Sequence, residues 1–147
     1  EWNAVDCLYF GLPETELPSK TPILHLDGSA EGPINNLTFI STLCECSPDG
    51  MALASASVIG RQDLAIDELV ESARKQLVSW FGESSKSWKN IRNYRITRAV
   101  PSCSAPIDLE TKIDGIYRCG DYLGLPSIDS AMRSGRKVAE AIIESSS

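Results

Sequence analysis

The segment GIYRCGDYLGLPSIDSAMRSG, residues 115–135, holds the residues of this chain best suited to bind a phosphorylated or sugar-bearing molecule. A short strand is predicted up to Cys119, and Gly120 permits a sharp turn directly after it. Asp121 then offers a carboxylate acceptor where the strand ends, which is where ligands of open α/β sheets gather. This order predicts a crevice between a strand and a helix in which a sugar-like hydroxyl could be bound.

A helix is predicted to follow, from about Ser127 to about Glu144. Ser127 is a typical N-cap, and Asp129 places a carboxylate in the first turn, where the positive end of the helix dipole favours it. An apolar stripe with helical spacing is formed by Ala131, Gly135, Val138 and Ile142. Gly135 costs about 1 kcal/mol against alanine, which close packing on a sheet or cofactor would explain. On these residues alone, an ordinary turn and an ordinary cap are an equally good interpretation.

The segment resembles the C-terminal flavin-binding motif of the flavin-containing amine oxidase and phytoene-desaturase-like superfamily of FAD-dependent oxidoreductases. Gly120 and Asp121 match its Gly-Asp pair; the later matches are Ser127, Ile128, Asp129, Ala131, Ser134 and Gly135. The cofactor-binding residues that the resemblance implies are Gly120, Asp121, Ser127, Ile128, Asp129, Ser130 and Ala131. In such enzymes the Asp contacts the ribityl or pyrophosphate part of FAD, and the first helical amides face the isoalloxazine carbonyl edge. Pro126 and Ser130 depart from the motif, and Ser130 adds a side chain where the cofactor approaches.

The resemblance extends over nearly the whole chain and implies two domains. Residues 1–100 are similar to the β-sheet and helix region of a substrate domain, and residues 101–147 to the C-terminal FAD-binding segment. The run PINNLTFISTLCECSPDGMALASASVIG resembles a substrate-domain hairpin, and ITRAVPSC resembles a strand returning towards the flavin. On this basis Trp88, Tyr94 and Pro101 are placed nearest the substrate. For Trp88 and Tyr94, ordinary core or rim aromatics are the favoured alternative.

The expected fold class is α+β (mixed α/β), with substrate-domain strands, one long central helix and a C-terminal helix. Strands are predicted at 4–10, 23–26, 37–46, 51–59, 91–100 and 113–119. The central helix is predicted over 63–81, with Asp63 as its cap and Gly82 as its end. Residues 28–36 and 102–112 are expected to be loops. Alternate residues of 51–59 form a small-residue face that favours packing against a helix, with a flat ligand as the alternative; they are Ala52, Ala54, Ala56 and Val58.

Composition restricts the classes of function. The chain has 147 residues, enough for one core, and a formal net charge of −6 without a Lys/Arg run, which argues against nucleic-acid binding. No apolar run approaches the roughly 20 residues that span a bilayer. The start at Glu1, without Met, is interpreted as a processed or truncated chain.

The five cysteines are odd in number and thinly spread, so no disulfide framework is predicted. Cys44 and Cys46 are expected on one face of a strand. Small buried thiols are favoured over a zinc site, because His25 is the sole histidine and no metal-ligand set is visible. Reduced thiols favour an intracellular compartment, either plastid (chloroplast) or cytoplasm.

No nucleophile or acid–base pair can be identified, so the catalytic residues are unknown. The resemblance implies a C-terminal fragment of an oxidoreductase that transfers hydride from an amine or an unsaturated carbon substrate to FAD. The Gly-rich dinucleotide-binding fingerprint is missing, so an N-terminal dinucleotide-binding region would be needed as partner, and the isolated chain is expected to be inactive. Two alternatives remain open. One is a non-catalytic truncated binding module, and the other is a stand-alone α+β domain with a coincidental Gly-Asp turn.

Overall fold

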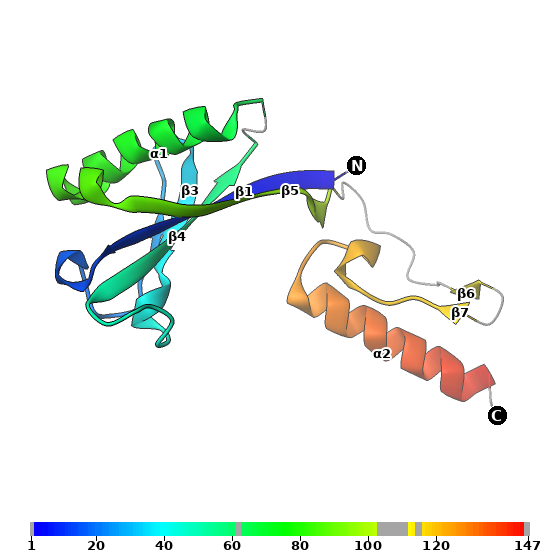
Figure 1. Ribbon diagram of the computed structural model, residues 1–147. Helices are drawn as coiled ribbons and strands as arrows, with labels where there is room; N and C mark the ends of the chain where they lie inside the picture. The colour runs from blue at the N-terminus through cyan, green and yellow to red at the C-terminus, as the bar shows by residue number, and fades with distance from the viewer. Residues whose placement is uncertain (1, 61–62, 103–111, 114–115, 146–147) are drawn as a thin grey trace. The chain divides into compact units, whose positions relative to one another are not determined.

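The computed structural model describes residues 2–60, 63–102, 112–113 and 116–145, which form two compact units (Figure 1). One unit is Ala4–Thr97, and the other combines Glu1–Asn3 with Arg98–Ser147. The elements are β1 (Trp2–Pro13), β2 (Leu24–Leu26), β3 (Ile34–Phe39), β4 (Met51–Ile59), α1 (Ile66–Phe81), β5 (Lys89–Pro101), β6 (Lys112–Ile113), β7 (Ile116–Tyr117) and α2 (Ile128–Ser145). The predicted α+β class is confirmed.

The first unit is a five-stranded sheet with one long helix on one of its faces (Figure 1). The strand order is β2-β3-β4-β1-β5, and β4 pairs antiparallel with both β1 and β3. Alternation along β1 and β4 sends one set of side chains into a core shared with α1. The strand members of this core are Leu8, Phe10, Leu12, Ala52, Ala54, Ala56 and Val58. The small-residue face of β4 therefore packs into the hydrophobic core, as the favoured prediction stated.

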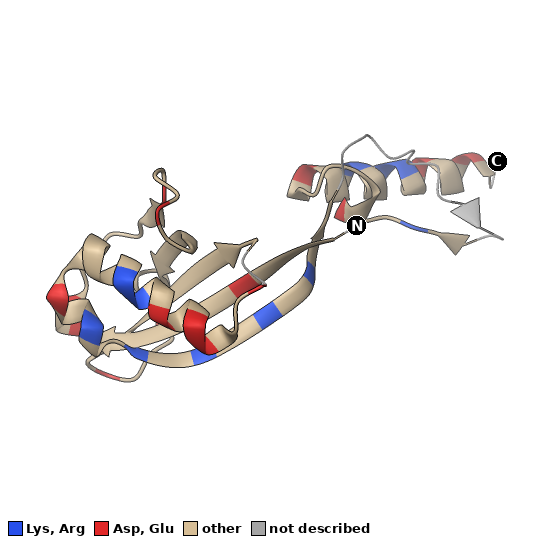
Figure 2. Cartoon of the chain, turned by 90° about the horizontal axis from the view of Figure 1, so that it is seen from above, with Lys and Arg blue, Asp and Glu red and all other residues tan. Residues whose placement is uncertain are grey.

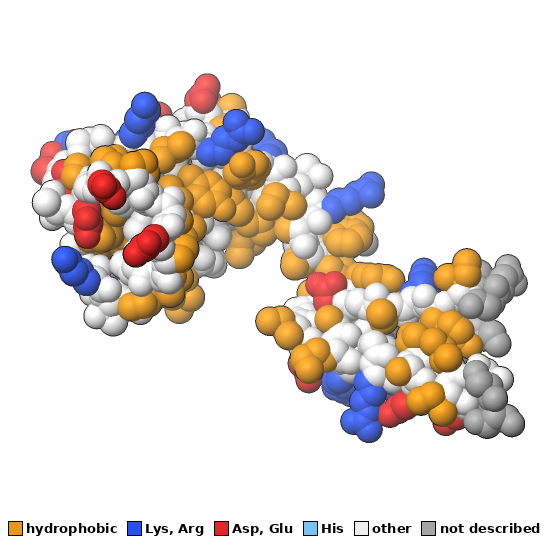
Figure 3. Space-filling model, turned by 60° about the horizontal axis from the view of Figure 1, so that its bottom comes forward, with side chains coloured by type: hydrophobic (Ala, Val, Ile, Leu, Met, Phe, Trp, Pro, Cys, Tyr) orange, Lys and Arg blue, Asp and Glu red, His pale blue; other side chains and the backbone are white. Residues whose placement is uncertain are grey.

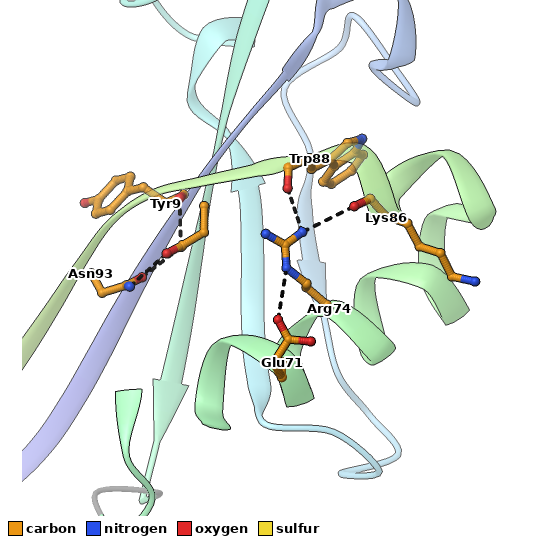
Figure 4. A network of polar contacts seen from close by, with 7 residues as sticks. Tyr9, Glu71, Arg74, Lys86, Trp88 and Asn93 are labelled. Atoms are coloured by element: carbon orange, nitrogen blue, oxygen red, sulfur yellow. Dashed lines mark hydrogen bonds and ion pairs between the residues drawn. The ribbon is translucent and has the colours of Figure 1, made fainter. Parts of the chain in front are cut away.

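Arg74 of α1 ties the helix to the start of β5 (Figure 4). Its guanidinium donates to the carbonyl oxygens of Trp88, at 2.7 Å, and of Lys86, at 3.4 Å, and lies 5.7 Å from the centroid of the Phe10 ring. The Trp88 side chain is 1% exposed and belongs to the core, and its indole N–H donates to Glu16 at 2.7 Å. Trp88 is thus a core aromatic, which was the favoured alternative to a place near the substrate.

Gln76 of α1 joins the helix to β3 on the other side of the unit. Its Oε1 accepts from the Ile34 N–H at 2.7 Å, and its Nε2 donates to the Ile34 carbonyl and to Asp27, both at 3.0 Å. A Cβ placed on Gly32 would lie 2.2 Å from the Gln76 amide carbon. The prediction of a loop over 28–36 was therefore wrong at its end, because buried Ile34 is fixed by Gln76 and begins β3.

The central helix begins at Ile66, with Ala65 as N-cap residue, so the prediction of Asp63 as the cap was wrong. Arg95 of β5 explains the difference, because its Nη2 donates to the Leu64 carbonyl at 2.9 Å and Asp63 contributes to the negative field around the guanidinium. These contacts hold Asp63 and Leu64 in a turn before the helix, and Ala65 has extended backbone angles. The predicted end is confirmed, since Gly82 has φ 84°.

The predicted strand over 37–46 ends early, at Phe39. A 3₁₀ turn, Ile40–Thr42, follows and is closed by the Thr42 hydroxyl, which donates to the Phe39 carbonyl at 2.7 Å. Cys44 and Cys46 consequently lie in a loop, and they are exposed rather than buried. The exposed Cys119 contradicts the prediction of buried thiols in the same way, whereas Cys103 lies outside the described residues.

Figure 2 shows where charged residues lie along the chain. β5 is the edge strand of the sheet, and its basic residues recur along it (Figure 2): Lys89, Arg92, Arg95 and Arg98. Charged residues on an edge strand discourage pairing with other chains. In the part of the chain that the structure describes, no helix is long and apolar enough to cross a membrane.

The second unit contains the hairpin β6–β7, a 3₁₀ turn at Asp121–Leu123, and α2. The strand predicted over 113–119 is shorter in the structure. Ile113 belongs to β6, β7 covers only Ile116–Tyr117, and residues 114–115 lie outside the described residues. The predicted loop over 102–112 also lies largely outside them. α2 runs over Ile128–Ser145, close to the predicted bounds.

Candidate functional site

The predicted Gly-Asp turn is attached to α2 by a buried serine. The Ser134 hydroxyl accepts from the Gly120 N–H at 2.8 Å and lies 3.2 Å from the Gly120 carbonyl oxygen; it also lies 2.8 Å from the Ala131 carbonyl. Gly120 has φ 151°, a conformation that L side chains rarely adopt. The glycine is therefore required here both by its backbone angle and by the Tyr122 ring, which fills the space that a Cβ would need.

Asp121 follows as the first residue of the 3₁₀ turn and is half-buried. Leu123, in the same turn, is 4% exposed, and the Leu123 N–H donates to the Gly120 carbonyl at 3.3 Å. A Cβ on Gly120 would meet the Tyr122 ring at 2.5 Å, so that ring lies directly against the turn. Asp121 is thus held on a short anchored turn, and its carboxylate is available to accept from a hydroxyl.

The start of α2 is capped as predicted, because the Ser127 hydroxyl accepts from the Ser130 N–H at 3.1 Å. The Ala131 N–H donates to the Ser127 carbonyl at 3.1 Å. Two of the predicted binding amides, those of Ser130 and Ala131, therefore already have acceptors within the chain. The amides of Ile128 and Asp129 precede the first helical hydrogen bond and have no helical acceptor.

Exposed apolar side chains surround this helix start. Leu125 is 66% exposed, Ile128 is 83% exposed and Met132 is 71% exposed. Hydrophobic side chains are visible on the face of the second unit that Figure 3 shows. The site accordingly combines backbone N–H donors and a carboxylate with apolar surface, which suits a flat ligand with polar edges.

Gly135 does not show the close packing expected of it. A Cβ built there meets no atom of the described residues within 4 Å. The space beside this glycine, one turn beyond Ala131, is open in the described part of the chain. Within those residues, nothing accounts for the glycine.

The structure brings Gly120, Asp121 and the first two turns of α2 together. It also assigns a part to Ser134, which the sequence matched to the motif without giving it a contact. The available signal was the Ser134-Gly135 pair, which matches the Ser-Gly of the family motif. Of the residues placed nearest the substrate, Tyr94 is 49% exposed and makes an edge-to-face contact with Tyr9, and its role and that of Pro101 stay predictions.

Other chemistry-bearing residues serve the fold. His25 lies between Phe39 and Phe81, with ring centroids 5.7 and 5.1 Å away, and burial lowers its pKa. Asp27 accepts hydrogen bonds from Ser29, two residues further along the chain, and so closes a local turn. These hydrogen bonds lower the pKa of the Asp27 carboxyl. The described residues contain no group of three or more His, Cys, Asp or Glu side chains placed to hold a metal ion.

Comparison with known proteins identifies the family. The family described as flavin containing amine oxidoreductase matches residues 2–143, which include both units and the whole candidate site. No curated protein matches the chain.

Two solved structures share the fold. Reduced UDP-galactopyranose mutase has a TM-score of 0.53 and 13% identity over 69% of this chain and 22% of its own. The PF1083 protein from Pyrococcus furiosus has a TM-score of 0.51 and 14% identity over 69% of this chain and 24% of its own. The chain thus spans less than a quarter of the length of either protein. The match over residues 2–143 shows that this chain belongs to the flavin-containing amine oxidoreductase family.

Proposed function

We propose that this chain is the C-terminal part of an FAD-dependent oxidoreductase that oxidises an amine or an unsaturated carbon substrate. The observation that carries the proposal is the family match over residues 2–143, which includes the anchored turn and helix start at 120–131. Bound flavin would supply the hydride-accepting chemistry. The protein's part is to bind the cofactor, orient the substrate and exclude water.

The donors and acceptors at 120–131 fit the flavin end of FAD. Asp121 would accept from a hydroxyl of the ribityl chain, and the amides of Ile128 and Asp129 would donate to the carbonyl edge of the isoalloxazine ring. The exposed Leu125, Ile128 and Met132 offer apolar surface to a flat ring. Ser127, Ser130 and Ala131 would act through the cap that fixes the helix start.

The adenosine and pyrophosphate half of FAD needs a Gly-rich strand–turn–helix that this sequence lacks. We therefore propose that an N-terminal dinucleotide-binding region completes the site. The first unit would then form part of the substrate side, with Tyr94 of this unit and Pro101 of the second unit as the residues nearest the substrate. A phytoene-desaturase-like or amine-oxidising reaction is equally compatible with this division.

The decisive experiment measures FAD bound by the complete gene product that contains this chain. We expect visible flavin absorbance in the wild-type protein after desalting. Asp121→Ala should bind FAD about 10- to 100-fold more weakly, because one hydrogen bond to a charged acceptor contributes about 1.5–3 kcal/mol. The matched control is Glu140→Ala, which removes an exposed carboxylate from α2 of the same unit and should leave FAD binding unchanged.

Circular dichroism of each variant checks that folding is intact. Retention of FAD by a folded Asp121→Ala protein at wild-type affinity would overturn the assignment of the site. A colourless wild-type protein that does not take up added FAD would instead favour the non-catalytic binding module. Anaerobic mixing with amines and with polyenes, followed by loss of flavin absorbance, would distinguish the two substrate classes.

A further inference from the structure

Cys44 and Cys46 lie two residues apart on the surface of the first unit. Both are exposed, and they lie in the loop between the 3₁₀ turn Ile40–Thr42 and β4. The Cys44 thiol donates to the Ile40 carbonyl at 3.8 Å. Both residues line one open pocket, and hydrogen bonding with Cys46 is the main cause that raises the pKa of Cys44.

Short sequence separation keeps the pair within bonding range. Two residues that are two positions apart have Cα atoms at most about 7 Å apart. A disulfide needs Cα atoms separated by about 4.4–6.8 Å. Because the loop is not part of the sheet, its backbone can adjust over this small range without breaking strand pairing.

The surroundings of the pair restrict the reagent that can reach it. The thiols line an open pocket of about 510 Å³, whose carboxylates are Glu14, Glu45 and Asp49. Negative charges disfavour the approach of anionic oxidants such as oxidised glutathione, but they do not repel a small neutral oxidant. The described residues contain no group of three or more His, Cys, Asp or Glu side chains placed to hold a metal ion, so the loop does not form an ordinary zinc site with them.

We propose that Cys44 and Cys46 are a peroxide-oxidised dithiol that forms a reversible disulfide within the loop. The Cys46 thiolate attacks one oxygen of hydrogen peroxide, forming a sulfenic acid, and the other oxygen leaves as hydroxide, which is protonated to water. The Cys44 thiol then attacks the Cys46 sulfur and displaces a second water. In total, two thiols are oxidised by two electrons, one peroxide is reduced, and two waters are formed.

The order of the steps follows from the local contacts. The Cys44 thiol donates to the Ile40 carbonyl, whereas the Ser41 and Ser47 hydroxyls lie 3.8 and 3.9 Å from the Cys46 sulfur and can donate to it, so the first attack is assigned to Cys46. The second step is intramolecular, so the effective concentration of Cys44 is on the order of millimolar or higher. An exposed disulfide in so short a ring is easily reduced, which makes it a labile modification rather than a structural crosslink.

Oxidation of the two cysteines should also change a hydrogen bond at β4. The Ser41 hydroxyl accepts from the Leu53 N–H at 2.8 Å and lies 2.6 Å from the Ser47 hydroxyl and 3.8 Å from the Cys46 sulfur. Moving Cys46 into a disulfide changes this serine network. Hydrogen exchange at the Leu53 amide should therefore become faster in the oxidised protein.

The test treats the full chain with hydrogen peroxide and maps the cysteines by mass spectrometry. In the wild type we expect a Cys44–Cys46 disulfide that dithiothreitol reverses. In Cys44→Ser, a dimedone adduct should accumulate at Cys46, and sulfinic acid there should rise about tenfold because no resolving thiol remains. Cys46→Ser should give little adduct at Cys44. Cys119→Ser, which removes an exposed cysteine of the other unit, is the matched control and should leave the pair's oxidation unchanged.

Three outcomes would overturn the proposal. The first is that Cys44 and Cys46 both remain alkylatable while Cys119 is oxidised. The second is that both thiols proceed to sulfinic acid at the same rate in the wild type and in Cys44→Ser. The third is that the disulfides formed join different chains. Each would show that the two thiols do not act as a pair.

Discussion

The two units of this chain differ in how much apolar surface they bury. Fifteen residues of the first unit form one core cluster, from β1, β3, β4, α1 and Trp88, which directly precedes β5. Of the described hydrophobic residues in the second unit, Leu123 is the one classed as buried, while Ile116, Ile128, Met132 and Ile143 are all at least 66% exposed. The first unit therefore has a complete core of its own. The second presents a fixed turn and helix start whose apolar surface needs a further layer, as a cofactor-binding segment would.

Cavity formation gives the largest expected contrast. Leu77→Ala, in the core of the first unit, should lower the free energy of unfolding by about 2–5 kcal/mol. Met132→Ala, on the exposed side of α2, should change it by less than about 0.5 kcal/mol. Urea unfolding measures both changes, followed by tryptophan fluorescence for the first unit, where Trp88 lies in the core, and by circular dichroism for the helix α2. Equal losses would show that the exposed face of α2 is buried in solution.

Ion pairs give the next contrast. Asp6 is fully buried and accepts from Arg95 at 2.8 Å and 3.2 Å, and this hydrogen bonding raises the pKa of Arg95. Asp6→Asn should cost about 1.5–3 kcal/mol, since it weakens a charged hydrogen-bonded pair at a buried site. Arg136→Gln breaks the exposed pair with Glu140 and should have no measurable effect. The same urea titration measures the free energy of unfolding of both variants. An unchanged value for Asp6→Asn would contradict the claim that the pair stabilises the first unit.

Ser134→Ala tests the contacts through which α2 holds the Gly-Asp turn. Loss of its hydroxyl leaves the Gly120 N–H without an acceptor at a cost of about 1–3 kcal/mol. Exchange of the Gly120 amide should then become about tenfold faster or more. Ser145→Ala, whose hydroxyl bonds back to Ile142 near the end of the same helix, should leave Gly120 unchanged. Unchanged exchange in Ser134→Ala would show that the turn is held by other contacts.

Acid should affect the first unit slightly through His25, the chain's sole histidine. Burial lowers its pKa below the ordinary value of 6.5, so the unfolded chain binds a proton first as pH falls. Its stabilising contribution is complete above pH 6.5 and declines below it, until the lower folded pKa is reached. Melting temperatures between about pH 7 and pH 5.5 should therefore fall more for the wild type than for His25→Phe. Asp27, whose pKa is lowered from 3.8, acts in the more acidic range. Parallel pH profiles of the two proteins would contradict this role for His25.

The sequence predicted correctly those element boundaries that depend on interactions between residues close together in the chain. β4 was predicted at its observed bounds, Gly82 ends α1, and Ser127 caps α2, because alternation, a left-handed glycine and an N-cap act within a few residues. The starts of α1 and β3 could not be predicted. They depend on Arg95 and Gln76, which reach them from segments distant in sequence.

The candidate site was predicted to a similar extent. The resemblance located the turn and the helix start, but not the Ser134 hydroxyl that joins them, since its partner Gly120 is fourteen residues away. It also did not predict that Ser130 and Ala131 use their amides within the cap. The cofactor contacts, the substrate and the compartment stay predictions, because they depend on molecules outside this chain.

The Gln76 bridge has a consequence for natural variation at Gly32. The backbone of Gly32 does not have a positive φ, so turn geometry does not require glycine at this position. The glutamine amide occupies the volume that any other side chain would need there. Homologues should therefore replace Gly32 only together with Gln76, and paired substitutions at the two positions in diverged sequences would record this shared space.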